Sequence, residues 1–439
     1  MTLSFLPQLS GYDPVATSEG SIDPLGLYLI SERLATTLVP GLRERMSHPR
    51  FLTAMAVGHV LCQEFDEQQV AADGQSPPWM VYEWLLVQAL TKLNKGGAEV
   101  VGLPGSLKAR RALELKQPLS ATSYLKNPGT FGFHGVYRTL ATEIQLLGRH
   151  QLGECGHKLV QVWEKEQNLQ GFLSSSSGPG AAFRTKYTTS IRRCLQSGTS
   201  ENWGWEGLRE LAECLHPNTI GREEATFVYG ILSQDEKGYR SEILQFMAGD
   251  GAAILAMHRS ERYFHEHLLA YASTPLAGHL EAILAYEHFA RLLQNVWEEV
   301  LYLLSQTKTK LAVTEMTSCR AVQDAVALLH TAWVNATKKL AAVKLHLAFE
   351  NQFAFFSHPL SGEELIEKLI AHHQVIQKAK PPFGKRPWIE DWSKGYYSVR
   401  PAYTRKDPPS FSGAYVNAYR SFSLLSFLKD LDHVPSPVA

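Results

Sequence analysis

Residues 280–304 read LEAILAYEHFARLLQNVWEEVLYLL, and this stretch decides the class of the fold. Its apolar side chains recur every three or four residues, and its glutamates fall largely between them. This period is typical of an α-helix that turns one face toward a core. Residues 322–347 repeat the pattern through Val322, Leu329 and Leu340. The sequence therefore predicts a mainly α protein with a multi-helical body.

Start and stop signals predict further helices on both sides of this core. Asp23 can cap a helix that ends before Pro40, because its carboxylate can accept backbone N–H bonds. Ser76-Pro77 has the same logic, and Ser361 with Glu364 forms a capping-box pattern. A short amphipathic helix is expected within residues 415–431.

The chain of 439 residues is long enough for several packed segments. The tract Ser174-Ser175-Ser176-Ser177-Gly178-Pro179-Gly180 is typical of a flexible loop or domain boundary. Texture changes along the chain predict five segments, which are 1–100 (helical), 101–170 (basic, winged-helix-like), 171–180 (Ser/Gly-rich linker), 181–375 (long helices) and 376–439 (aromatic and basic).

Composition narrows the environment in which the protein works. Lys+Arg and Asp+Glu are equal at 43 each, so no global field attracts the chain to nucleic acid or to an anionic membrane. The five cysteines are scattered without a CxxC pair, which favours reduced thiols. No apolar run of about 18 residues appears. We expect a cytoplasmic protein that has no membrane partner.

Local charge is more informative than net charge. Residues 108–158 contain eight Lys/Arg against three acids, and residues 376–410 again contain eight against three. Such clusters bind phosphates. The alternative for both stretches is an ordinary solvated surface. The residues predicted to contact nucleic acid are Lys108, Arg110, Arg111, Arg138, Arg149, Lys385, Arg386 and Arg400.

The second basic stretch also carries aromatic side chains that can stack on exposed bases or on arginine planes. The alternative is a loop that its aromatic residues anchor to the protein. The residues concerned are Trp388, Trp392, Tyr396, Tyr397 and Tyr403.

Two helices expected at 136–146 and 155–166 are joined by the short stretch 147–153, which predicts a helix-turn-helix with a short wing. Its recognition helix would present Arg138, Thr139, Thr142 and Gln145 outward together. A winged helix that binds only other proteins is the equally weighted alternative.

Catalytic and metal-binding signals are sparse. His258 and His265 share a helical face with Glu261 between them, so a metal site is geometrically possible, but an ordinary helix surface is the favoured interpretation. No phosphate-binding glycine loop, nucleophile elbow or zinc motif is found. We assign no catalytic residue, no metal and no cofactor, and we favour a protein that is not an enzyme.

Several short motifs carry a resemblance. They are Asp23-Pro24-Leu25-Gly26, Tyr124-Leu125-Lys126-Asn127-Pro128-Gly129, Gly132-Phe133-His134-Gly135-Val136-Tyr137 and Ala285-Tyr286-Glu287. Together the chain resembles uncharacterised bacterial proteins found in phage-defence gene neighbourhoods. The resemblance implies partner proteins such as an ATPase, a helicase or a nuclease, and it transfers no functional residue.

The leading hypothesis is a non-catalytic subunit of a bacterial antiviral defence complex that contacts DNA and partner proteins. Two alternatives stay open at this point. One is a diverged metal-dependent nuclease of such a system, suggested by scattered His and Glu residues, and the other is a scaffold that binds only proteins.

Overall fold

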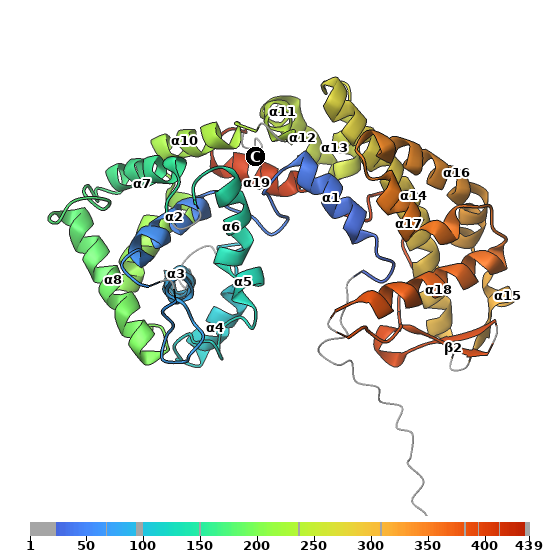
Figure 1. Cartoon of the computed structure of the whole chain (residues 1–439), viewed down its shortest axis with the longest axis horizontal. Coiled ribbons are helices and arrows are strands. Elements are labelled where there is room, and N and C mark those ends of the chain that lie inside the picture. Colours follow the sequence, from blue (N-terminus) through green and yellow to red (C-terminus); the bar gives the residue numbers. More distant parts are fainter. Residues whose placement is uncertain are drawn as a thin grey trace, which may run out of the picture. The chain divides into compact units, whose positions relative to one another are not determined.

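The computed structural model describes residues 23–434 except 67, 94–99, 149–150, 236–237, 308–309, 382, 394 and 412. These residues form mainly helices, which confirms the predicted fold class (Figure 1). The chain divides into two compact units. Unit 1 comprises Met1–Ala35 and Ser260–Tyr419, and unit 2 comprises Thr36–Arg259 and Arg420–Ala439. The predicted linker 171–180 lies within unit 2.

Unit 1 contains α14 and α16, the two longest helices of the described residues. The elements that contribute to this unit are α1 (Tyr28–Leu38, which continues into unit 2), α13 (Glu261–Leu268), α14 (Thr274–Gln306), β1 (Leu311–Ala312), α15 (Val313–Met316), α16 (Arg320–Ala342), α17 (His346–Gln352), η4 (Ala354–Phe356), α18 (Gly362–Ala379), β2 (Ile389–Ser393), β3 (Tyr396–Val399) and η5 (Pro401–Tyr403).

Helices α14 and α16 pack along each other and form the centre of unit 1, with α17 and α18 against them. The deciding stretch 280–304 lies inside α14, which starts earlier because Ser273 caps it and Pro275 suits its first turn. The predicted capping box of α18 is confirmed, since Ser361 and Glu364 each bind the other's backbone N–H.

A small antiparallel sheet, in the order β1-β3-β2, was not predicted. Its strands lie in or pair with the stretch 381–409, where the sequence indicated only irregular structure. The sheet escaped the sequence analysis because β2 lacks an alternating pattern, with four of its five side chains half-buried or exposed.

The segment Asp23–Leu27 is held in unit 1 by side chains that bind five successive backbone carbonyls. These carbonyls, from Asp23 to Leu27 in order, accept hydrogen bonds from Lys380, His373, His372, Gln352 and Tyr286. The Asp23 carboxylate accepts the N–H groups of Leu27 and Tyr28, as its predicted capping role requires, although α1 begins only at Tyr28.

Unit 2 is built from shorter helices. They are α2 (Arg50–Cys62), α3 (Pro78–Leu93), α4 (Ser106–Glu114), α5 (Pro128–Phe131), α6 (Phe133–Glu143), α7 (Glu154–Glu166), α8 (Pro179–Ser197), α9 (Gly207–Leu215), η2 (Pro217–Thr219), α10 (Arg222–Leu232), α11 (Arg240–Phe246), η3 (Met247–Gly251), α12 (Ala252–His258) and α19 (Ser421–Asp430).

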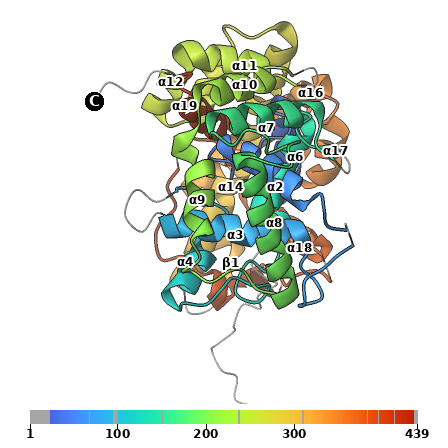
Figure 2. The same ribbon diagram turned by 90° about the vertical axis from the view of Figure 1, so that its left-hand side faces the viewer.

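Helices α2 and α3 are the core of unit 2. Their sequences RFLTAMAVGHVLC and PWMVYEWLLVQALTKL are apolar on all sides, which is typical of helices that are surrounded by others. Helices α6 and α7 pack on α2, whereas α4, α8 and α9 pack on α3. Figure 2 shows α8 and α9 crossing α3.

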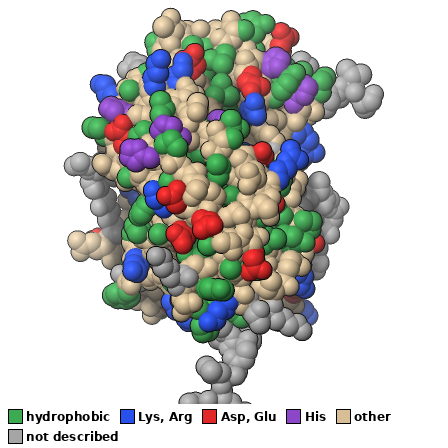
Figure 3. Space-filling view, turned by 90° about the vertical axis from the view of Figure 1, so that its right-hand side faces the viewer, with side chains coloured by type: hydrophobic (Ala, Val, Ile, Leu, Met, Phe, Trp, Pro, Cys, Tyr) green, Lys and Arg blue, Asp and Glu red, His purple; other side chains and the backbone are tan. Residues whose placement is uncertain are grey.

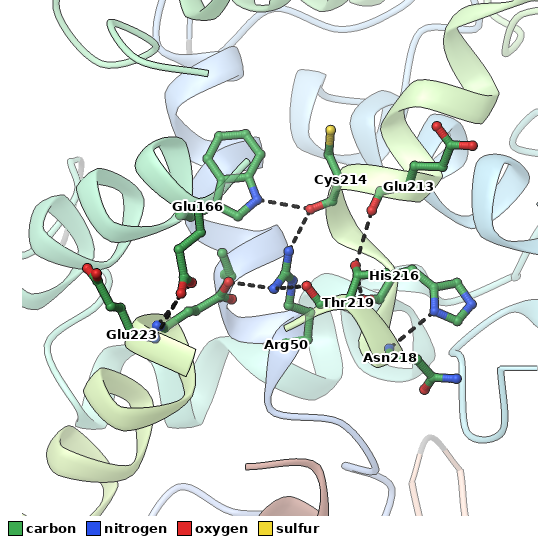
Figure 4. A network of polar contacts seen from close by, with 11 residues as sticks. Arg50, Glu166, Glu213, Cys214, His216, Asn218, Thr219 and Glu223 are labelled. Carbon is green, nitrogen blue, oxygen red and sulfur yellow. Dashed lines mark hydrogen bonds and ion pairs between the residues drawn. The ribbon is translucent and has the colours of Figure 1, made fainter. Parts of the chain in front are cut away.

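A buried ion pair connects the helices of unit 2 (Figure 4). Arg50 Nη1 lies 2.5 Å from Glu224 Oε2, and both side chains are fully buried. The guanidinium also donates to the carbonyls of Cys214 and Thr219, at 2.8 and 3.1 Å. Glu166 of α7 accepts the N–H of Glu224 at 3.1 Å and so caps α10. The pair therefore ties α2 to α9, η2 and α10.

We expect Arg50→Ala to destabilise unit 2 by about 3–5 kcal/mol, because it leaves the Glu224 carboxylate buried without its cation. Arg209→Ala, which breaks the exposed pair with Glu213, should have little effect on stability, because solvent screens that pair. Urea unfolding measures both. Replacing both Arg50 and Glu224 by Met should destabilise unit 2 less than Arg50→Ala does. An equal loss of stability in all three variants would contradict the role given to the ion pair.

The second prediction concerns His373, whose Nε2 accepts the N–H of Trp388 while Nδ1 donates to Pro24. Burial lowers the pKa of His373 to about 4 from 6.5. Its neutral form therefore stabilises unit 1 above about pH 6.5, and this contribution is lost as the pH falls toward 4.

We expect His373→Gln to make the free energy of unfolding less dependent on pH between about 6.5 and 4, by up to roughly 3 kcal/mol. Urea unfolding at several pH values measures the effect. His358→Gln, at an exposed position of unit 1, is the control. Parallel pH profiles for His373→Gln and the wild type would show that His373 does not titrate as described.

Candidate nucleic-acid interface

The loop 42–48 between α1 and α2 is held against α6 at both ends. Gly41 has a φ of +75°, and a Cβ on it would lie 2.9 Å from the Cα of Leu140 on α6. Only glycine permits this backbone conformation together with so close an approach. At the other end, the hydroxyl of Tyr137 accepts the N–H groups of Ser47 and His48, at 3.0 and 3.3 Å.

Helix α19 also holds the loop 42–48 through hydrogen bonds from its side chains. Ser423 Oγ donates to the carbonyl of Glu44 at 2.9 Å, and Ser426 Oγ donates to that of Ser47 at 2.7 Å. Nδ1 of His48 lies 2.5 Å from the Asp430 carboxylate. The loop is thus anchored by helices that are distant from it in the sequence.

The anchored loop brings two arginines to α5 and α6. Arg43 Nη2 donates to Thr139 Oγ1 at 3.1 Å. The Arg45 guanidinium lies 4.8 Å from the ring centroid of Phe131, within the range of a cation–π contact. Arg138, next to Thr139 on α6, is exposed. We call Arg43, Arg45 and Arg138 the arginine cluster.

Further exposed cations lie on α4 and in the segment that leads from it to α5. These residues are Lys108, Arg111, Lys116 and Lys126, and together with the arginine cluster they form what we call the basic surface. Figure 1 shows α4, α5 and α6 following one another along one side of unit 2. Within the described residues, no cation of the basic surface lies within 4.0 Å of a carboxylate.

The cations of α7 to α9, in the same unit, are bound differently. Of the seven Lys/Arg between residues 154 and 215, Arg184 donates to the carbonyls of Phe172 and Ser175. The other six pair with carboxylates, as Lys158–Glu154, Lys165–Glu223, Lys186–Glu210, Arg192–Glu64, Arg193–Glu201 and Arg209–Glu213. In contrast to α7 to α9, the basic surface carries positive charge without a fixed counter-charge, and an anionic ligand can supply that counter-charge.

The structure places the predicted residues of the first stretch as follows. Lys108, Arg111 and Arg138 are exposed, and Arg110 is half-buried. Arg149 lies outside the described residues. The predicted recognition side chains Thr139, Thr142 and Gln145 are exposed together with Arg138 on and just after α6.

A winged helix is not confirmed. In the described part of the α6–α7 connection, a single antiparallel bridge joins Leu147 to Leu152. Helices α6 and α7 pack on α2 rather than forming a module of their own. The finding that stands is that Arg138, Thr139 and Thr142 face outward on α6 in a multi-helical unit.

The three predicted residues of the second stretch, in unit 1, differ in exposure and in charge pairing. Arg386 lies 3.8 Å from Glu390, and Lys385 is half-buried. Arg400 is only 2% exposed, and its guanidinium lies 5.7 Å from the Tyr403 ring. The contact of Arg400 with nucleic acid stays a prediction, and the fold turns the charge of this residue into the protein. Figure 3 shows acidic and basic side chains mixed over one face of unit 1.

Sequence analysis missed Arg43 and Arg45. The two residues stand in a short loop with Glu44 between them, so a local charge count gives no signal. Their partners Phe131 and Thr139 are about ninety residues away in the chain. Pro40-Gly41 predicted only the end of the preceding helix, not the helix against which Gly41 packs.

A buried carboxylate positions α6. Both oxygens of Glu83 on α3 are used, since they accept the N–H groups of Phe133 and His134 and the hydroxyl of Tyr124. Burial raises the pKa of Glu83 to about 7 and lowers that of His134 to about 4. The adjoining pocket of about 50 Å³, which Trp79 also lines, has room for only a few waters. These groups support α6 rather than forming a catalytic site.

The histidines considered for a metal have other roles. His265 is buried with Nδ1 3.1 Å from the Tyr415 hydroxyl, and Glu261 accepts the N–H of Tyr419 at 2.7 Å. His258 is exposed. Among the described residues, no group of His, Cys, Asp or Glu side chains is arranged to hold a metal ion.

The comparisons with known proteins add no homologue. No family model matches the sequence, and no match was found among curated proteins or solved structures. None of the helices in the described part of the chain combines the length and apolar character needed to cross a membrane.

We expect Gly41→Ala to weaken the attachment of the loop to α6. A matched control exists, because Gly74 has the same φ of +75° but has no atom within 4 Å of an added Cβ. Both substitutions strain the backbone, and only Gly41→Ala also clashes with α6. It should therefore destabilise unit 2 by about 1–2 kcal/mol more than Gly74→Ala, as measured by urea unfolding. Equal losses would show that the loop does not depend on this approach.

Proposed function

We propose that the protein binds DNA through the basic surface of unit 2, with the arginine cluster at its centre. The observation that carries the proposal is the contrast within unit 2. Cations on α7 to α9 are held by carboxylates or carbonyls, whereas the cations of the basic surface have no carboxylate partner among the described residues. An exposed cation without a partner can release counterions when it neutralises a phosphate.

The arrangement of the arginine cluster also supports this function. Arginine is well suited to phosphate, because its planar guanidinium offers several donors. Arg43 and Arg45 are oriented by Thr139 and Phe131, so less side-chain freedom is lost when a phosphate binds. Exposed polar side chains beside Arg138, namely Thr139 and Thr142, can donate to the DNA backbone or to base edges.

The biological setting of the proposal rests on the resemblance to proteins of phage-defence neighbourhoods. We propose that the chain is a non-catalytic subunit of such a system and brings partner proteins to DNA. In such a complex an ATPase, helicase or nuclease partner would perform the chemistry.

The test is the binding of fluorescein-labelled duplex DNA as a function of salt. Wild-type protein should bind at low salt, and the logarithm of its affinity should fall linearly with the logarithm of salt concentration. The variant Arg43→Glu/Arg45→Glu/Arg138→Glu should lose at least about tenfold in affinity, and its salt slope should be smaller by about three.

The matched control is Lys158→Glu/Lys165→Glu/Arg209→Glu, which makes the same change in charge at exposed, paired residues of unit 2. It should bind DNA with close to wild-type affinity. Equal losses of DNA affinity in both variants would show that only the net charge of the protein matters, not the arginine cluster. A different result would assign the chain to protein binding instead. In that case the protein would not bind DNA, and its complexes with partner proteins would form at high salt and also with the charge-reversed arginine cluster.

A further inference from the structure

The small sheet of unit 1 has an outer face that its register defines. Ser398 pairs with Glu390 and Tyr396 pairs with Ser393, and residues directly opposite each other in an antiparallel pair share a face. Tyr397, between them, points to the other face and is 5% exposed. Ala312 pairs with Tyr396, so this face continues onto β1.

Two aromatic rings stand on this outer face. Trp392 falls at a register shift of β2, and its Nε1 donates to Ser398 Oγ at 2.7 Å, which lays the indole toward β3. Trp392 is 57% exposed and Tyr396 is 48% exposed. The ammonium of Lys310 lies 5.0 Å from the centroid of the Trp392 ring. We call Trp392, Tyr396 and Lys310 the aromatic platform.

Three of the five aromatic residues predicted to stack on bases are packed against the protein instead. Trp388 and Tyr403 stack on each other with centroids 4.5 Å apart and planes at 5°, and Tyr397 is buried. Anchoring therefore accounts for these three rings. It does not account for Trp392 and Tyr396, which keep about half of their surface in solvent although exposed large aromatic side chains are unfavourable in water.

We propose that the aromatic platform stacks unpaired bases of single-stranded DNA, so that the protein recognises DNA with a single-stranded segment. This inference rests on the proposed DNA-binding function and specifies its substrate. Exposed rings on a sheet, beside cations, bind single strands because every base has a flat face that stacks on an aromatic side chain. Bases within a duplex are stacked on one another and offer no such face at the side of the helix.

Charge on the platform fits a nucleotide. When a base stacks on Trp392, the phosphate of the neighbouring nucleotide would lie within reach of Lys310. The ammonium of Lys310 can then leave its contact with the Trp392 ring and bind that phosphate. The carboxylate on the same face, Glu390, faces Arg386 at 3.8 Å. Asp391 pairs with Tyr397 and so belongs to the opposite face. A membrane surface fits less well, because a pair of amphipathic rings with an ion pair beside them buries little apolar area.

The experiment measures the binding of the full chain to a fluorescein-labelled oligothymidylate and to a hairpin duplex by fluorescence anisotropy. Trp392→Ala/Tyr396→Ala should weaken oligothymidylate binding by about tenfold or more and leave duplex binding unchanged. Trp392→Phe/Tyr396→Phe keeps both flat rings and should restore most of the affinity. Tyr271→Ala removes an aromatic side chain that is 68% exposed elsewhere in unit 1 and should have no effect.

The outcomes separate the platform from the proposed function. If Trp392→Ala/Tyr396→Ala binds oligothymidylate like the wild type, while reversal of the arginine cluster abolishes DNA binding, the platform is overturned and the DNA-binding proposal stands. Wild-type protein that binds neither DNA at low salt overturns both. Binding to phosphatidylserine vesicles that the alanine variant loses, with oligothymidylate binding intact, would assign the face to a membrane surface.

Discussion

The ion pair between Arg50 and Glu224 is the constraint on which unit 2 depends. Two opposite charges without solvent are stable only if they are paired and their remaining donors and acceptors are satisfied. The carbonyls of Cys214 and Thr219 and the hydroxyl of Thr53 meet this requirement in part. Burial raises the pKa of Glu224, and the charge of Arg50 opposes that shift. The pair therefore fixes the points at which α2, α9 and α10 meet.

This arrangement determines where the loop before α2 can lie. Arg50 is the first residue of α2, so the loop 42–48 enters the helix at a fixed point. From there the hydroxyl of Tyr137 and the side chains of α19 hold the backbone, and Gly41 brings its other end onto α6. The arginine cluster thus results from a buried polar network rather than from any basic motif.

Both units use buried polar side chains to hold backbone, as Glu83 does in unit 2. Unit 1 uses buried side chains to hold extended backbone, and Glu287 is an example, since it accepts the N–H of Val416 and the hydroxyl of Tyr419. Two of the short sequence motifs, Asp23-Pro24-Leu25-Gly26 and Tyr286-Glu287, belong to these contacts. These motifs therefore serve packing, whereas the surfaces proposed to bind DNA consist of exposed side chains.

The sequence by itself determined the helical class, the long helices α14 and α16, the capping box of α18 and the charge excess around α4 and α6. Each depends on a local pattern of a few turns of helix. Only the tertiary structure decided which charges are available. It buried Arg400, paired Arg386 and brought Arg43 and Arg45 to α6 and α5, about ninety residues away in the chain. It also sorted five aromatic residues into three anchors and two exposed rings. The physical reason is that exposure and charge pairing depend on contacts between distant segments, and a local pattern does not contain them.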